Sequence, residues 1–357
     1  MTFSRSLLAI VAAGLFAGCV TSQSVSEGEA SPRPTAVGAD RCAVDDEVSG
    51  WAGRWLDAWT LASTDVLDLT DAPAPDIVFF DDICVYTTVA LTASGAPVVP
   101  GPDLGGERLA WRAAPHGGTL TLPDSSEMPV ALSTFASVVS GDPYIVMAAP
   151  TFWAQAGVDS EELGRDRLVT AVFVHEVSHT RHAGAYGARI QSVMDSLDAV
   201  GLIPDPFQFS DNVARDFFGD DPAYVEAQAS ERDLLYRAAE AETDAEVRAL
   251  AAEALAMMRR RRADFLAAEP TVFELDDIFL AMEGAGQAAG VGWLAHPEGG
   301  GLDRATAVAG MDRGGWPERH GLALFLVLDR LLPEWPRLVY GDGAPGAEAL
   351  LARAVGE

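Results

Sequence analysis

The chain has 357 residues, 49% of them hydrophobic, which is enough apolar material for one large core or for two lobes. Its formal net charge is -29 at pH 7. Because a basic surface is needed to neutralise phosphate groups, this charge argues against nucleic acid as a partner. The same charge favours solubility and suits exported, acidic surroundings.

Residues 1–18 are typical of a secretory signal peptide. A positively charged start precedes an apolar run from Leu7 to Ala17, which is too short to span a membrane. The segment Phe16-Ala17-Gly18-Cys19 resembles a bacterial lipobox, with phenylalanine where leucine is usual. The resemblance implies that Cys19 is lipidated and becomes the mature N-terminus. We therefore expect an exported protein that is lipid-anchored in the cell envelope; an ordinary cleaved signal with a chance cysteine is the alternative.

Residues 19–44 are predicted to form a disordered tether. Positions 20–41 are rich in Ser, Glu, Pro, Gly and Ala and contain almost no large apolar groups, so they cannot bury enough surface to fold. The folded part is then expected at 45–357. We divide it into a sheet-containing lobe at about 45–183 and a helical lobe at about 184–357.

Two cysteines remain once Cys19 is assigned to lipid. They are Cys42 and Cys84, and an exported compartment permits a disulfide between them. Two free buried thiols are the alternative, because sequence alone cannot show that the two side chains meet.

An amphipathic first helix is predicted around Trp51, Trp55 and Trp59, which recur every four residues. We expect this aromatic stripe to pack in the core, with a ligand platform as the minor alternative.

A small sheet, mostly antiparallel or mixed, is predicted between Pro75 and Pro150. It is indicated by short β-prone runs separated by Gly, Pro and Asp. These runs lie at 77–80, 85–89, 119–122, 129–132 and 144–147.

A metal motif follows the predicted sheet. Ser160 with two glutamates provides a helix start, and an apolar run then leads into His175-Glu176-Val177-Ser178-His179. On a helix, His175 and His179 lie about 40° apart around the axis and roughly 6 Å along it, so they can share one metal ion. Glu176 flanks that ion and can take a proton from a metal-bound water. A metal-free buried helix is the alternative.

The rest of the chain is predicted to be mainly helical. Gly184 and Gly187 should end or kink the motif helix, and Pro222 suits the first position of a new one. Thr243 and Thr271 each begin a capping-box pattern. Later helices are expected at about 321–332 and 347–354, and the arginines at 259–262 are expected to be a solvated or salt-bridged helix end.

The motif at 175–179 resembles the signature of zincin metallopeptidases, which implies a zinc ion and a third protein ligand. The metzincin pattern fails, because Ala185 stands where its third histidine is needed. His182 cannot complete a tetrahedron from the same straight helix, so we expect it behind the ligands or on the surface.

A glutamate from a later helix is the remaining solution. Glu283 begins Glu283-Gly284-Ala285-Gly286, which is similar to the Glu-Gly-x-Ala of aminopeptidase-like gluzincins with glycine for the alanine. Glu226 is the alternative, in a segment that looks like the Glu-x-x-Ala-Asp of other gluzincins with Ser230 for the aspartate. Glu231 and Glu318 are further candidates.

The resemblance implies an α+β, zincin-like fold and a gluzincin-like zinc metallopeptidase that acts on peptides or proteins. In zincins a sheet edge beside the metal helix binds the substrate backbone, and we expect the last strand of the sheet in that place. The alternative is a non-catalytic, zinc-containing envelope lipoprotein that binds a partner or acts as a scaffold. The residue that stabilises the oxyanion is left open among Tyr186, Tyr224, His296, His320 and Tyr340.

Overall fold

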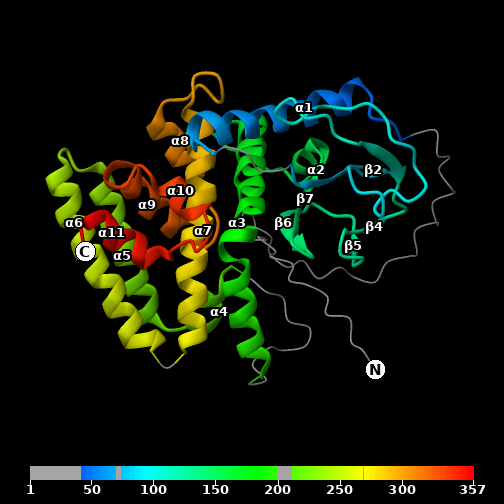
Figure 1. Ribbon diagram of the computed structural model, residues 1–357. Helices are drawn as coiled ribbons and strands as arrows, with labels where there is room; N and C mark the ends of the chain where they lie inside the picture. Colours follow the sequence, from blue (N-terminus) through cyan, green and yellow to red (C-terminus); the bar gives the residue numbers. More distant parts are fainter. Residues whose placement is uncertain (1–41, 70–73, 200–210, 268) are drawn as a thin grey trace.

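The computed structural model describes residues 42–69, 74–199, 211–267 and 269–357. The predicted signal peptide, Cys19 and almost all of the predicted tether lie outside these ranges. The protein is α+β, as expected, with a small mixed sheet in its N-terminal half and helices in the rest (Figure 1). Within the described ranges, none of the helices combines the length and the apolarity that a membrane crossing needs.

Helix α1, Asp46–Leu61, carries the tryptophan stripe. Asp45 caps its first turn, because its carboxylate accepts two backbone N–H bonds. Trp51 and Trp55 pack against the ring of Phe79, at centroid distances of 5.5 and 5.3 Å. The stripe is therefore core packing, as predicted.

Five strands form a mixed sheet in the order β3-β2-β1-β7-β6. β1 and β7 run parallel, and the other neighbours run antiparallel. These strands are β1 (Asp76–Phe80), β2 (Cys84–Thr87), β3 (Arg112–Pro115), β6 (Thr134–Val139) and β7 (Asp142–Ala148). A separate hairpin joins β4 (Thr119–Thr121) to β5 (Glu127–Pro129).

Strand β1 is buried on both faces of the sheet. Ile77 and Phe79 belong to the main core, which also contains side chains of α1. Val78 and Phe80 belong to a smaller core, because successive side chains of a strand point to opposite faces. The sheet therefore separates the main core from a second apolar layer.

Three details of the sheet differ from the prediction. β3 and β6 were not predicted, and the run expected at 129–132 is only the end of β5. The expected edge strand, β7, lies inside the sheet, and the edge strand that packs beside the motif helix is β6. The β-propensity of a segment indicates how well its side chains suit a pleated sheet surface. It does not indicate which strand lies at the edge of the sheet.

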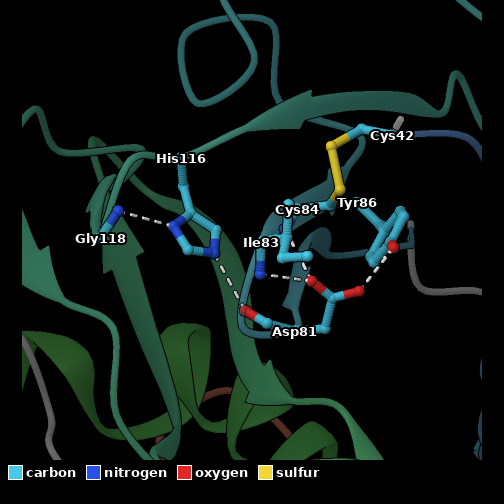
Figure 2. Close-up of a disulfide and its surroundings, with 7 residues drawn as sticks. All are labelled: Cys42, Asp81, Ile83, Cys84, Tyr86, His116 and Gly118. Carbon is cyan, nitrogen blue, oxygen red and sulfur yellow. Dashed lines mark hydrogen bonds between the residues drawn. A yellow bond between two sulfur atoms is a disulfide. The ribbon is translucent and has the colours of Figure 1, made fainter. Parts of the chain in front are cut away.

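Cys42 and Cys84 form a disulfide, with their Cα atoms 5.6 Å apart (Figure 2). It joins the segment before α1 to the first residue of β2. The turn that precedes Cys84 is held by Asp81, whose carboxylate accepts the backbone N–H of Ile83 and the hydroxyl of Tyr86. The disulfide thus attaches the start of the domain to a well-bonded corner of the sheet.

Helix α3, Arg165–Ala199, is 35 residues long and carries the metal motif. It begins later than predicted, because the Ser160 hydroxyl caps a preceding turn by accepting the N–H of Leu163. Of the two alternatives predicted for Gly184 and Gly187, an end of the helix or a kink, the first is wrong. The helix continues through both glycines and crosses the predicted border between the two lobes.

The other helices cover the C-terminal half of the chain. Pro222 begins α5 and Thr243 forms a capping box with Glu246, both as predicted. The capping box predicted at 271–274 does not form, because α7 begins earlier, at Pro270. These and the remaining helical segments are α2 (Pro150–Gln155), α4 (Val213–Phe218), α5 (Pro222–Glu240), α6 (Asp244–Arg261), α7 (Pro270–Ala295), α8 (Arg304–Met311), α9 (Trp316–Leu331), α10 (Trp335–Val339), α11 (Ala347–Val355) and the π-helical turns Ala62–Val66 and Arg262–Leu266.

Helix α7 is largely buried and packs against both α3 and α9 (Figure 1). Every residue from Ile278 to Val291 is buried. The α7–α9 contact depends on two glycines: a β-carbon on Gly284 would lie 2.7 Å from the carbonyl oxygen of Gly321. Side chains next to this crossing are therefore brought unusually close together.

The arginine run at the end of α6 is a salt-bridged helix end, as the sequence indicated. Arg261 and Arg262 are buried. Arg261 lies 2.9 Å from Glu231, and Arg262 lies 2.8 Å from Asp277. These pairs connect α6 to α5 and α7. Because their charges are paired and buried, Arg261 and Arg262 do not contribute to a basic surface of the kind that binds nucleic acid.

Candidate metal centre

The residues of the motif lie in the interior of the protein. They directly follow the apolar run of α3, which packs in the core. The exposed fractions of His175, Glu176 and His179 are 0%, 0% and 5%. An ionisable group buried this deeply must be paired, hydrogen-bonded or bound to a metal. What surrounds these three side chains therefore decides what they do.

Two imidazoles and one carboxylate converge on a single point. The Nε2 atoms of His175 and His179 lie 2.9 Å apart, and the Oε2 atom of Glu283 lies 3.1 Å from the first and 3.4 Å from the second. An ion held by tetrahedral bonds to N and O atoms separates its ligand atoms by roughly 3.3 Å. The three side chains could thus hold a metal ion.

Protons alone do not satisfy this triangle. A neutral imidazole Nε2 carries either one proton or one lone pair, whereas each of the three atoms faces two others. Burial lowers the pKa of His175, so at neutral pH its ring is the uncharged form that metals bind. A cation at the centre of the triangle would bind all three lone pairs at once.

Glu283 reaches the triangle from α7, 108 residues further along the chain than His175. Gly286 makes the approach possible, because a β-carbon at this position would lie 2.7 Å from Nδ1 of His175. The glycine that replaces the alanine of the Glu-Gly-x-Ala pattern therefore has a steric reason here.

Glu176 lies beside the triangle with both of its carboxylate oxygens buried and without a hydrogen-bond partner in the described part of the chain. Burial raises its pKa well above the ordinary value, and the carboxylates of Glu283, Asp211 and Glu318 raise it further. A carboxylate with a raised pKa is a stronger base than an exposed one. Glu176 is thus suited to accept a proton next to a bound ion.

His182 lies behind the triangle rather than in it. Its Nδ1 atom is 3.2 Å from Nδ1 of His179, the ring nitrogen that does not face Glu283. Its ring stacks on Tyr340, with centroids 4.7 Å apart and planes 7° apart. The contact fixes the ring of His179 and leaves its Nε2 free to face His175 and Glu283.

The alternative third ligand is elsewhere. Glu226 is exposed on α5 and does not belong to the cluster. Glu231, one turn later, is buried but pairs with Arg261 and with His320, each at 2.9 Å. Burial alone would raise the pKa of Glu231, but its contacts with Arg261 and His320 lower it to about 2. The structure brings Glu283, and not Glu226, to the two histidines.

Most of the candidates for oxyanion stabilisation are already engaged. The hydroxyl of Tyr186 donates to the carbonyl of Pro345 at 2.8 Å, and the hydroxyl of Tyr224 accepts from Arg261 at 2.7 Å. His320 is held by Glu231. Tyr340 is the candidate whose ring contacts the site, through its stack on His182.

Two further carboxylates lie beside Glu283. Oxygen atoms of Asp211, Glu283 and Glu318 all lie within 4.8 Å of one another. Asp211 was not among the residues expected at the site, and Glu318 was expected only as a further candidate for the third zinc ligand. Glu318 lies in the first turn of α9, where an acidic residue is an ordinary helix start, so no sequence signal distinguishes it.

No protein-family model, no curated protein and no solved structure matches this chain.

Proposed function

We propose that the protein is a zinc-dependent hydrolase, a gluzincin-like metallopeptidase in which His175, His179 and Glu283 hold the metal and Glu176 is the general base. The observation that carries the proposal is the triangle of two Nε2 atoms and one carboxylate oxygen, 2.9 to 3.4 Å on a side, with an unpaired glutamate next to it.

Zinc is the metal that suits this donor set best. Two imidazoles and one carboxylate match the ligands of catalytic zinc sites, which keep a fourth position open. Sites for magnesium or calcium are built from oxygen ligands, so two nitrogen donors argue against them. When bound, zinc would polarise a substrate carbonyl and lower the pKa of a nearby water molecule.

In this reaction Glu176 takes part in two proton transfers, first as acceptor and then as donor. Its carboxylate accepts a proton from the attacking water and then donates it to the leaving amine. His175, with its neutral ring, and His179, held from behind by His182, would hold the ion through their Nε2 atoms. A peptide bond needs both transfers, because its amine leaves only after protonation.

A sheet edge beside α3 supports a peptide substrate. β6 is an edge strand that pairs with β7 on one side, and it packs beside α3. An extended peptide can add to such an edge through backbone hydrogen bonds. In this proposal β6, rather than β7, binds the backbone of the substrate.

The same proposal includes a location in the cell envelope. The predicted signal peptide and the lipobox-like segment ending at Cys19 support export and a lipid anchor. Replacing Cys19 by alanine should release the protein from the membrane fraction. If the variant stays in that fraction, the anchor at Cys19 is excluded.

The test of function compares Glu176→Gln with the wild-type protein on a peptide library analysed by mass spectrometry. We expect the variant to retain one equivalent of zinc and to lose hydrolysis by at least ~100-fold. A chelator should abolish cleavage by the wild-type protein, and added zinc should restore it. Glu226→Gln removes an exposed carboxylate and is the matched control. Undiminished turnover by Glu176→Gln would remove Glu176 from the mechanism.

One observation favours a second candidate, a zinc-containing envelope lipoprotein that binds a partner without turnover. The metal-binding side chains and Glu176 are at most 5% exposed, so a substrate reaches them only if the site opens. Against this candidate, a closed structural site has no use for an unpaired base. Zinc bound stoichiometrically, with no chelator-sensitive cleavage of any library peptide, would decide in its favour.

A further inference from the structure

We propose that Asp211, Glu283 and Glu318 form a second cation site next to the proposed zinc site, for a divalent ion that prefers oxygen ligands, and that Glu283 lies between the two ions. The proposal shares Glu283 with the proposed zinc site and in that respect rests on it.

The first support is the shared carboxylate. The Oε2 atom of Glu283 faces the two histidines, whereas its Oε1 atom is buried and has no hydrogen-bond partner in the part of the chain that the structure describes. A glutamate with one oxygen directed at a metal site and the other without a partner can bridge two ions. In two-metal sites the ions lie ~3.5–4 Å apart, a spacing that one carboxylate spans.

The second support is Glu318, which is 1% exposed. Its Oε2 atom is buried and has no hydrogen-bond partner among the described residues. The neighbouring Arg319 bonds to Asp312 at 3.1 Å and provides no counter-charge. A buried carboxylate oxygen without a hydrogen-bond partner is costly, and the cost is removed if a cation binds to that oxygen.

The third support is the balance of charge. Oxygen atoms of Asp211, Glu283 and Glu318 lie within 4.8 Å of one another, and all three residues are buried. Carboxylates this close in the interior cannot all stay ionised unless a cation offsets their charge. An ion at His175 and His179 would bind only Glu283 of the three, so a second divalent ion would be needed to offset Asp211 and Glu318.

Helix packing explains why the carboxylates meet. Gly284 and Gly321 let the backbones of α7 and α9 touch, and Glu283 and Glu318 lie next to this crossing on the two helices. Asp211 closes the group from the segment just before α4, and its Oδ1 atom accepts the Asn212 side-chain N–H at 2.7 Å.

An all-carboxylate donor set selects the kind of ion. Oxygen-only sites suit Mg²⁺, Ca²⁺ and Mn²⁺, whereas two imidazoles with a carboxylate suit Zn²⁺. The two proposed sites should therefore bind different metal ions. Mn²⁺ is the useful probe, because its paramagnetic resonance signal distinguishes free from bound ion.

The experiment titrates Mn²⁺ into full-length protein that has been stripped of metal and reloaded with one equivalent of Zn²⁺. We expect the wild-type protein to keep its zinc and to bind one further equivalent of Mn²⁺. Glu318→Gln should keep the zinc and weaken Mn²⁺ binding at least tenfold. Glu226→Gln, which changes an exposed carboxylate, should bind both ions as the wild-type protein does.

Two results would overturn the proposal. One is a wild-type protein that binds zinc but no stoichiometric Mn²⁺, which would leave the proposed function intact. The other is Mn²⁺ binding by Glu318→Gln that equals that of the wild-type protein. A wild-type protein that binds no zinc would instead contradict the proposed function. If Glu318→Gln does not fold, the number of Mn²⁺ ions bound by the wild-type protein and the Mn²⁺ affinity of Asp211→Asn test the proposal in its place. Mn²⁺ binding by Asp211→Asn that equals that of the wild-type protein would then overturn it.

Discussion

Gly286 on α7 lies against the ring of His175 on α3, so closely that a β-carbon would come within 2.7 Å of Nδ1 and 2.8 Å of Cε1. Any side chain at position 286 must therefore displace the ring or push the two helices apart. We expect Gly286→Ala to weaken zinc binding at least tenfold, because the Nε2 atom of His175 would leave the triangle. Competition with a chelating dye measures the affinity.

Gly184→Ala is the control for this experiment. Gly184 is an exposed glycine of α3 with open space around its position, so the added methyl group meets nothing. Alanine is the better helix former by about 1 kcal/mol, and we expect unchanged zinc affinity with equal or higher stability. Equal zinc affinities for Gly286→Ala and the wild-type protein would show that the ring position does not limit binding.

His182 is expected to act as a positioning residue. His182→Phe keeps a ring to stack on Tyr340 but removes the contact between the Nδ1 atoms of His182 and His179. We expect zinc affinity to fall by about 10–100-fold while the fold is retained. His182→Asn can restore a hydrogen bond and should recover part of the loss. A purely structural role predicts the reverse order, with phenylalanine tolerated better than asparagine.

The buried pair of Glu231 and Arg261 should make stability depend on pH. The pKa of Glu231 is lowered from 4.5 to about 2 in the folded protein. Its contribution to stability is therefore complete above pH 4.5 and is lost as the pH falls towards 2. Glu231→Gln breaks a buried pair and should cost about 3 kcal/mol at pH 7.

Urea unfolding at several pH values checks this prediction. The difference in unfolding free energy between the wild-type protein and Glu231→Gln should narrow as the pH falls from 4.5 towards 2. Glu226→Gln, an exposed change on the same helix, should show almost no difference at any pH. A difference that stays constant down to low pH would exclude Glu231 as the responsible group.

The disulfide should stabilise the domain without controlling the metal centre. Cys42 and Cys84 are 42 residues apart, and a closed loop of this length is worth about 4 kcal/mol through the entropy of the unfolded chain. Reduction, or the double change to alanine, should lower the urea midpoint accordingly. Zinc affinity under native conditions should stay the same, because the proposed ligands come from α3 and α7. Coincident midpoints of oxidised and reduced protein would contradict the prediction.

Several features could be predicted because they depend on neighbours in the chain. The spacing of His175 and His179 places both rings on one helix face whatever the rest of the chain does. The tryptophan stripe of α1 and the capping box at Thr243 are equally local, and the structure has both. Glu283 was predicted from a partial match to a motif. It lies 108 residues from His175 in the sequence, and no local rule specifies that the two side chains meet.

Other features were decided only when distant segments packed together. β6, and not β7, forms the sheet edge beside α3. α3 passes through Gly184 and Gly187, although glycine usually weakens a helix. Asp211 and Glu318 join Glu283 because α7 and α9 touch at two glycines.

The amino-acid sequence by itself determined that His175, Glu176 and His179 lie close together on one helix, since helical periodicity acts over a few residues. Tertiary structure alone decided which carboxylates share their surroundings. The physical reason is that the burial of a charged group depends on every segment packed around it, and those segments are far apart in the chain.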